Sequence, residues 1–130
     1  MKTQYARLVL STATLLILLS SCTPKPTIKV PAEFQAGQNY FHKACASCHG
    51  VDALGKQTRA PGLIDSEYLP ENYSDEEMRK QIIEGSEKMR SQRNKVTDSE
   101  IDEIIKYLRY SQKAAELIFE EDESDSSTEG

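Results

Sequence analysis

The 130-residue sequence has no excess of positive charge, only three cysteines and two histidines, and no hydrophobic run long enough for a comfortable membrane span. Its 16 lysines and arginines are outnumbered by 21 aspartates and glutamates, which argues against nucleic-acid binding because that function needs a basic face. The apolar stretch at residues 8–19 is shorter than the roughly 20 residues of a membrane-spanning helix. No Ser-His-Asp set or pair of catalytic carboxylates is apparent. The length allows one small domain at most.

The N-terminal residues have the pattern of an export signal. Lys2 and Arg7 precede the apolar stretch, and the small-residue segment LSSC follows it at 19–22. This segment resembles a bacterial lipobox. The resemblance implies that residues 1–21 are a lipoprotein signal peptide and that Cys22 is acylated, with palmitate as a typical chain. The alternative is an ordinary signal peptide followed by a stray cysteine.

Two segments flank the predicted domain, which we place at residues 34–115. Residues 22–33 contain three prolines, so we expect a semi-extended tether that holds the domain up to roughly 30 Å from a bilayer. Residues 116–130 hold seven acids and no base, and we expect the end of the last helix followed by a disordered acidic tail. Once residues 1–21 are removed, 14 basic and 21 acidic residues remain. The body is therefore formally neutral and the acidity lies in the tail.

The most specific pattern is C-x-x-C-H at residues 45–49, the attachment signature of c-type haem. On a helix, Cys45 and Cys48 leave from the same face, where each thiol can form a thioether with one porphyrin. His49 follows directly and can bind iron as the proximal ligand. A thioredoxin-like redox disulfide is the first alternative, but the βαβ pattern that carries it is absent. A zinc site that adds His42 is the second, although no separated second ligand pair accompanies it.

Apolar spacing and capping residues predict an all-α protein. A helical period runs over residues 34–48. The capping box at 74–77 starts a second helix, and Gly85 suits its C-terminal end. Another capping box at 97–100 opens the last helix, which we expect to reach about residue 119. The apolar stripe of that helix consists of Ile101, Ile104, Ile105 and Leu108.

The order of these parts resembles a class I monohaem c-type cytochrome. Gly37, Phe41 and Cys45 match a glycine, an aromatic residue and the first cysteine at four-residue intervals in the family's N-terminal helix. Tyr107 and Leu108 resemble the pair through which the family's last helix crosses the first, with Gly37 and Phe41 as the expected partners. The resemblance implies a small cytochrome c-like fold of three to five short helices around one covalently attached haem c.

The resemblance also implies two axial ligands to iron. These are His49 and Met89, which follows the helix-ending Gly85 by four residues. Pro61 would accept a hydrogen bond from His49 and orient it. This sequence has Arg90 where the family usually has proline after the methionine, so we expect a less rigid ligand loop and a weaker bond between iron and sulfur.

A haem with both axial positions filled suits one-electron transfer, because oxygen and peroxide find no open site. The sequence therefore predicts an electron carrier that is tethered through Cys22 and faces the periplasm or the outer cell surface. The expected partners are a quinol-oxidising complex and a terminal oxidase. A fixed haem subunit of a larger respiratory or dehydrogenase complex is the alternative. If Met89 did not bind iron, His42 or Lys88 would be the substitute ligands, or a five-coordinate haem would turn over peroxide or bind gases.

The loop around Met89 is rich in positive charge. Four bases fall within eight residues, beside the expected haem edge: Lys88, Arg90, Arg93 and Lys95. Such a patch could steer an acidic redox partner in a salt-dependent manner. The alternative is a solvated loop whose charge balances the haem propionates.

Overall fold

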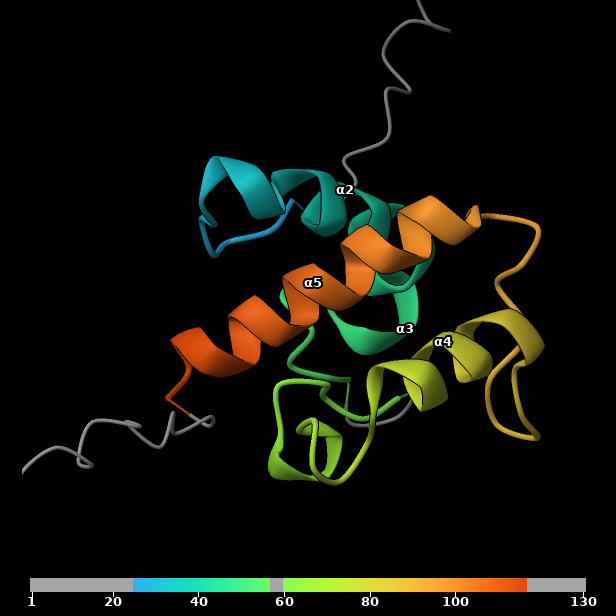
Figure 1. Cartoon of the computed structure of the whole chain (residues 1–130). Helices are drawn as coiled ribbons and strands as arrows, with labels where there is room; N and C mark the ends of the chain where they lie inside the picture. The colour runs from blue at the N-terminus through green and yellow to red at the C-terminus, as the bar shows by residue number, and fades with distance from the viewer. Residues whose placement is uncertain (1–24, 57–59, 117–130) are drawn as a thin grey trace, which may run out of the picture.

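The computed structural model describes residues 25–56 and 60–116, which form an all-α fold (Figure 1). The elements in chain order are η1 (Ala32–Phe34), α2 (Gln35–Ala44), α3 (Ala46–His49), η2 (Ser66–Tyr68), α4 (Asp75–Glu84) and α5 (Asp98–Ala114). Within these residues there is no strand, and Lys56 and Ala60 form a single isolated bridge. The predicted all-α class is confirmed. None of the described helices is long and apolar enough to cross a membrane.

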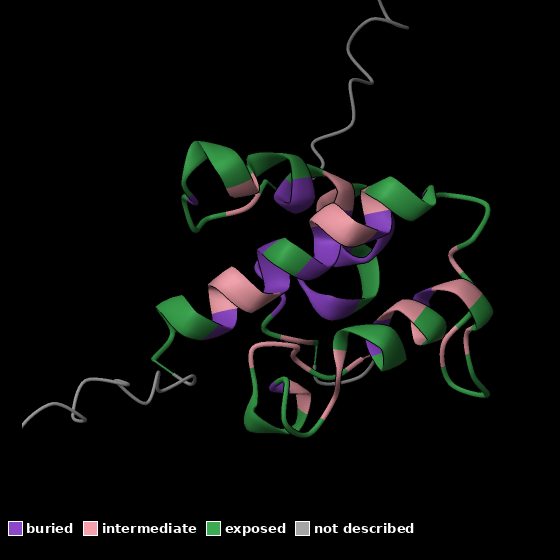
Figure 2. Cartoon of the chain, viewed as in Figure 1, coloured by how far each residue is buried: buried purple, intermediate pink, exposed green. Residues whose placement is uncertain are grey.

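The close crossing of α2 and α5 organises the core, and buried residues gather along these two helices and in α3 (Figure 2). A side chain at Gly37 would overlap the carbonyl oxygen of Glu103 and lie 2.8 Å from Cβ of Tyr107. Phe41 is fully buried, and its ring centroid lies 5.6 Å from that of Tyr107. The absence of a side chain at residue 37 therefore lets the two backbones approach, at the crossing that the sequence predicted.

The prediction of one continuous helix over residues 34–48 was wrong. The helix is interrupted at Cys45, which separates α2 from α3. The amide of Cys45 donates the last bond of α2 to the carbonyl of Phe41, at 2.8 Å. The carbonyl of Cys45 then accepts from the amides of both Cys48 and His49, at 3.0 Å each. The backbone turns at this residue, and α3 starts as a separate, single-turn helix.

Both predicted capping boxes are present. The Ser74 hydroxyl accepts from the Glu77 amide at 3.3 Å, and the Glu77 carboxylate accepts from the Ser74 amide at 2.9 Å. Thr97 and Glu100 repeat the arrangement at the start of α5. Each pair satisfies amide groups that would otherwise lack partners at a helix start. The predicted signal peptide, Cys22, the tail and the extension of the last helix beyond residue 116 lie outside the described residues.

The N-terminal arm, residues 25–31, lies against the domain. The Thr27 amide and hydroxyl donate to the two carboxylate oxygens of Asp52, at 2.9 and 2.6 Å, and the Ile28 amide donates to the same group at 3.2 Å. Gln38 on α2 donates to the Ile28 carbonyl at 2.8 Å. Val30 is buried in the core. Residues 27–30 are therefore part of the folded body, not of the free spacer that the prolines suggested.

Two side chains on α5 hold the irregular segment between residues 63 and 75. The Arg109 guanidinium donates to Asp75 at 2.7 Å and to the carbonyls of Tyr68 and Tyr73. Gln112 is fully buried and donates to the carbonyls of Leu63 and Tyr68, at 2.9 and 2.8 Å. A segment with little secondary structure of its own thus has its buried carbonyl groups satisfied from the helix beneath it.

The clamp on the N-terminal arm leads to a pH-dependent prediction. Burial of Asp52 would raise the pKa of its carboxyl group, but the hydrogen bonds from Thr27 and Ile28, helped by His42, outweigh burial and lower the pKa below its ordinary 3.8. Asp52→Ala should reduce the free energy of unfolding by about 1–3 kcal/mol at neutral pH, because the arm loses three hydrogen bonds to a buried, charged carboxylate. Urea denaturation of the holoprotein measures this loss.

The sign of the pH effect follows from the lowered pKa. The stabilisation from Asp52 is complete above about pH 4, the ordinary carboxyl pKa, and disappears as the pH falls through the lower folded-state value. The difference between wild type and Asp52→Ala should therefore shrink in acid. Glu87→Ala, which changes an exposed acid, is the control and should leave stability within about 0.5 kcal/mol. A difference that persists unchanged down to pH 2 would contradict this account.

Candidate haem-binding site

The two cysteines of the motif differ in their surroundings. Cys45 is buried and Cys48 is exposed, and both are free thiols. Burial raises the pKa of the Cys45 thiol to about 12, against a smaller opposing effect of the Lys95 ammonium group. Since the thiolate is the species that attacks a disulfide, the Cys45 thiol, which burial keeps protonated, is poorly suited to start disulfide exchange.

His49 is held by the loop that follows the motif. Its ring is buried, and Nδ1 lies 2.9 Å from the carbonyl oxygen of Pro61. With a proton on Nδ1 this is a hydrogen bond to Pro61, and Nε2 carries the lone pair that a metal needs. The sequence placed Pro61 next to His49, and the structure brings these two residues together.

Two glycines allow the loop to return so closely. Gly50 and Gly55 both have φ of +85°, a conformation that favours glycine. A side chain at Gly55 would lie 2.5 Å from the Gly62 amide nitrogen. The amide of Gly55 donates to the His49 carbonyl at 2.7 Å, and the Leu63 amide donates to the Ala53 carbonyl, also at 2.7 Å. These bonds fix the path of the chain on both sides of Pro61.

Met89 lies half-buried in the loop after α4 and packs against the core. Its amide donates to the Ser86 hydroxyl at 3.2 Å, and its carbonyl accepts from the Ser86 amide at 2.7 Å. A side chain at Gly85, where φ is +76°, would lie 2.5 Å from the Met89 carbonyl oxygen. Polar bonds thus hold this turn without a proline, while the less rigid loop and weaker iron–sulfur bond expected from Arg90 remain predictions.

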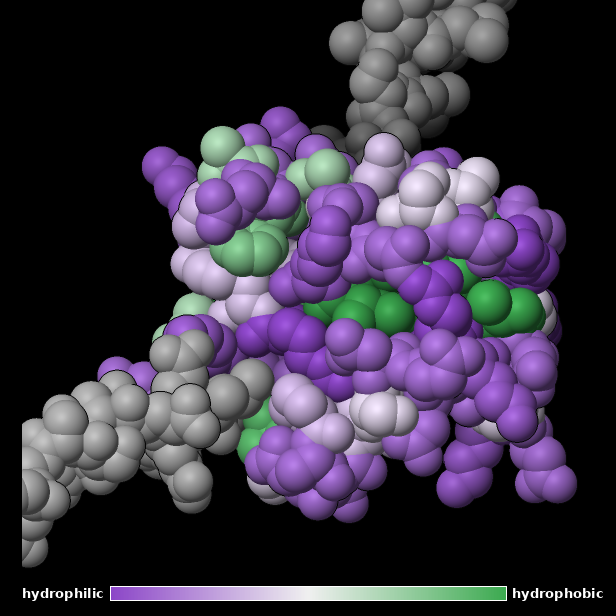
Figure 3. Space-filling model, viewed as in Figure 1, coloured by the Kyte–Doolittle hydropathy of each residue, from purple (hydrophilic) through white to green (hydrophobic). Residues whose placement is uncertain are grey.

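Several apolar side chains beside the core are only partly buried. Leu63, Ile64 and Ile83 are half-buried and, like Met89, pack against the core cluster. Figure 3 shows apolar side chains at the surface between α5 and α4. An imidazole nitrogen, a thioether sulfur and two thiols are the groups that hold a haem c. Within the described ranges, no cluster of three or more His, Cys, Asp or Glu side chains could hold a bare metal ion, so the zinc alternative gains no support.

One of the four bases in the predicted patch forms a salt bridge. Arg93 donates two hydrogen bonds of 2.6 and 3.1 Å to the carboxylate of Asp98 at the start of α5. Lys88, Arg90 and Lys95 are exposed, as is Arg93. The charge of Lys95 opposes the effect of burial on the pKa of the Cys45 thiol.

Lys56 is a further base at the motif that the sequence analysis did not single out. Its Nζ donates to the Ser47 carbonyl at 3.0 Å, which brings its charge to α3. Lys56 lies in a short loop, and nothing in the neighbouring sequence indicated that its side chain would reach α3. His42 is half-buried on α2, and its charge helps to lower the pKa of the Asp52 carboxyl group.

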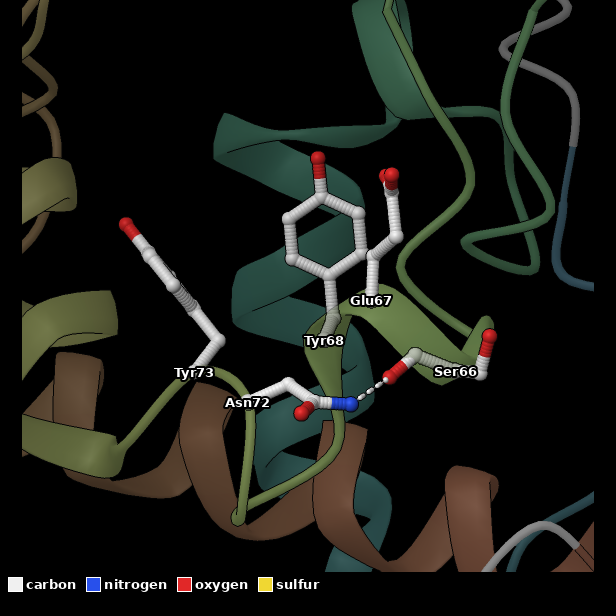
Figure 4. Close-up of a pocket in the computed structure, with 5 residues that line it drawn as sticks. All are labelled: Ser66, Glu67, Tyr68, Asn72 and Tyr73. Carbon is white, nitrogen blue, oxygen red and sulfur yellow. Dashed lines mark hydrogen bonds between the residues drawn. The ribbon is translucent and has the colours of Figure 1, made fainter.

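A shallow pocket lies between η2 and the start of α4 (Figure 4). The rings of Tyr68 and Tyr73 meet edge to face with centroids 5.7 Å apart, and Asn72 donates to the Ser66 carbonyl at 2.8 Å. The lining residues are Ser66, Glu67, Tyr68, Asn72 and Tyr73. None of them belongs to the predicted site, and we assign this pocket no role.

Comparison with known proteins gives one match. The family described as cytochrome C oxidase, cbb3-type, subunit III matches residues 32–108. This range contains the C-x-x-C-H motif as well as Pro61 and Met89, and it implies a covalently bound haem c. No curated protein and no solved structure matches the chain.

Removal of the two motif thiols tests haem attachment. When matured in a host that makes c-type cytochromes, the double variant Cys45→Ser and Cys48→Ser should be colourless and have the mass of the apo-polypeptide, because no thioether can form. Cys22→Ser is the matched control and should retain the full haem mass and colour. Absorption spectra and intact-protein mass spectrometry measure both. Haem that stays covalently bound in the double variant would contradict the assignment.

Proposed function

Since this chain belongs to the family of cytochrome C oxidase, cbb3-type, subunit III, we propose that it is a one-electron carrier with His49 and Met89 as the axial ligands of its haem c. The observation that carries the proposal is the placement of His49, whose Nδ1 faces the Pro61 carbonyl at 2.9 Å while Nε2 is left for iron. The bound haem supplies one-electron exchange between the ferrous and ferric states. The role of the protein is to fill both axial positions and keep the surroundings apolar.

Each proposed ligand comes from a different part of the fold. His49 is delivered by α3 and held by the loop through Pro61, whereas Met89 is delivered by the turn after α4. A hydrogen bond to the imidazole makes its other nitrogen a stronger donor. A thioether is a soft ligand that favours the ferrous state and raises the reduction potential. Together they support transfer of electrons over binding of oxygen or peroxide.

A fixed haem subunit of an oxidase complex is the second candidate, and the description of the matched family favours it. Both candidates use the same haem and the same ligands. They differ in whether the domain travels between complexes or stays within one. Native gel electrophoresis of gently solubilised membranes separates them, since a fixed subunit migrates with the oxidase and a free carrier does not.

We further propose that the domain is exported and anchored through an acylated Cys22, on the periplasmic or outer face of a bacterial membrane. Because Thr27 is held by Asp52, only residues 23–26 separate the anchor from the folded body. Even fully extended, this segment reaches about 15 Å. The large apolar side chains of Ile28 and Leu54 are exposed on the arm and near the clamp. The haem domain would thus stay close to the bilayer and exchange electrons with membrane complexes, such as a quinol-oxidising complex or a terminal oxidase.

The binding of Met89 to iron is tested by Met89→Ala. The oxidised wild-type protein should show the charge-transfer absorption band that is specific for iron bound by a methionine sulfur, and the variant should lose it. Met78→Leu is the matched control, because Met78 is buried on α4, and it should keep the band. A wild-type protein without the band would favour the five-coordinate alternative, with peroxide turnover or gas binding.

The exposed bases beside the motif are the proposed docking site for an acidic redox partner. A triple substitution of Lys88, Arg90 and Lys95 by alanine should slow electron transfer to the oxidase in native membranes and weaken the salt dependence of the rate. Substitution of Lys29, Lys80 and Lys106, which lie on other elements, removes the same charge and should have a smaller effect. Stopped-flow kinetics at several ionic strengths measures both. Equal rates and salt dependences for the two variants would contradict a localised site.

A further inference from the structure

The side chain of Gln81 faces the Met89 thioether. Gln81 lies half-buried on the last turns of α4, and its Nε2 is 3.6 Å from Sδ of Met89 and 3.0 Å from Oγ of Ser86. We propose that Gln81 is a positioning residue that orients the Met89 sulfur and reduces its strength as a donor to the haem iron. The inference rests on the proposed binding of Met89 to iron.

The position of the Gln81 amide is fixed by the turn that it meets. The Ser86 hydroxyl accepts from both the Gln81 side chain and the Met89 amide, at 3.0 and 3.2 Å. The Ser86 amide in turn donates to the Met89 carbonyl at 2.7 Å. Residues 86–89 therefore form a closed turn with the Gln81 amide bound to both of its ends. The contact with the sulfur is part of a network in which each group limits the movement of the others.

The far side of the turn is held as well. The Gln92 amide donates to the Ile82 carbonyl at 2.9 Å, and the Ser91 hydroxyl donates to the Ile83 carbonyl. The turn is thus bound to the C-terminal end of α4 on either side of Met89. The thioether, which has three rotatable bonds of its own, remains the least constrained group, and the Gln81 amide is the polar contact that reaches it.

The chemistry of a thioether gives this contact a consequence for iron. Its sulfur has two lone pairs, so it can accept a weak hydrogen bond with one and bind a metal with the other. A donor on the first lone pair withdraws electron density from the second. Ferric iron depends more on that density than ferrous iron, so the hydrogen bond favours the ferrous state. Gln81 should raise the reduction potential as well as direct the sulfur.

The test compares Gln81→Leu with Gln92→Leu in the full-length holoprotein. Leucine keeps the helix propensity and bulk of glutamine at residue 81 but cannot donate. Gln92 is the matched control because its side chain donates to the Arg90 carbonyl at 2.7 Å, within the same loop, and has no bond to the sulfur. Redox titration gives the potential, and the absorption band of sulfur-bound iron gives the ligation. Urea denaturation shows that each variant is folded.

We expect Gln81→Leu to keep the band and to have a lower potential than both wild type and Gln92→Leu. An unchanged potential in Gln81→Leu would overturn the proposal. An equal fall in both variants would also overturn it, because the change would then come from a general disturbance of the loop. If Gln81→Leu does not fold, Gln81→Ala, which suits a helix and cannot donate, replaces it with the same expected result, and Gln92→Ala is then the control. A wild-type protein without the band would instead refute the binding of Met89, and the role of Gln81 with it.

Discussion

The close contact between α2 and α5 sets the positions of the other elements of this domain. At Gly37 the backbone of one helix meets Glu103 and Tyr107 of the other with no room for a side chain. Since α2 leads directly into Cys45, this contact determines where α3 presents the haem motif. On the other side, Arg109 and Gln112 of α5 hold the segment after Pro61. One helix thus positions both the motif and the loop that orients its histidine.

Polar bonds, more than hydrophobic area, define the loops of this small domain. A chain of this size buries a limited core, and over a third of the described residues lie outside the helices. These segments are held by a few side chains that each satisfy several backbone groups: Asp52 for the N-terminal arm, Arg109 and Gln112 for the segment before α4, and Ser86 for the methionine turn. Each is a position where one substitution would free a loop without removing apolar surface.

The binding of the N-terminal arm by Asp52 links the proposed function to the fold. The arm that would connect the domain to a membrane is bound to the carboxylate of Asp52, three residues after the haem-motif histidine. The motif, its orienting loop and the origin of the tether therefore form one rigid unit. If the domain is anchored as proposed, such a unit would present its haem to partners from a position near the bilayer. A long flexible linker would let the haem domain move farther from the membrane but would control its orientation less well.

The all-α class, the haem motif, the two capping boxes and the glycine at the helix crossing could all be predicted from the sequence, because each depends on residues close together in the chain or on a strict spacing. The break at Cys45, the binding of Thr27 and Ile28 to Asp52, the pairing of Arg93 with Asp98 and the hydrogen bonds around Met89 could not. Three prolines suggested a free arm, whereas a carboxylate more than twenty residues away binds it. Such contacts depend on polar partners that are distant in the chain, and they are visible only once the fold has brought donor and acceptor together.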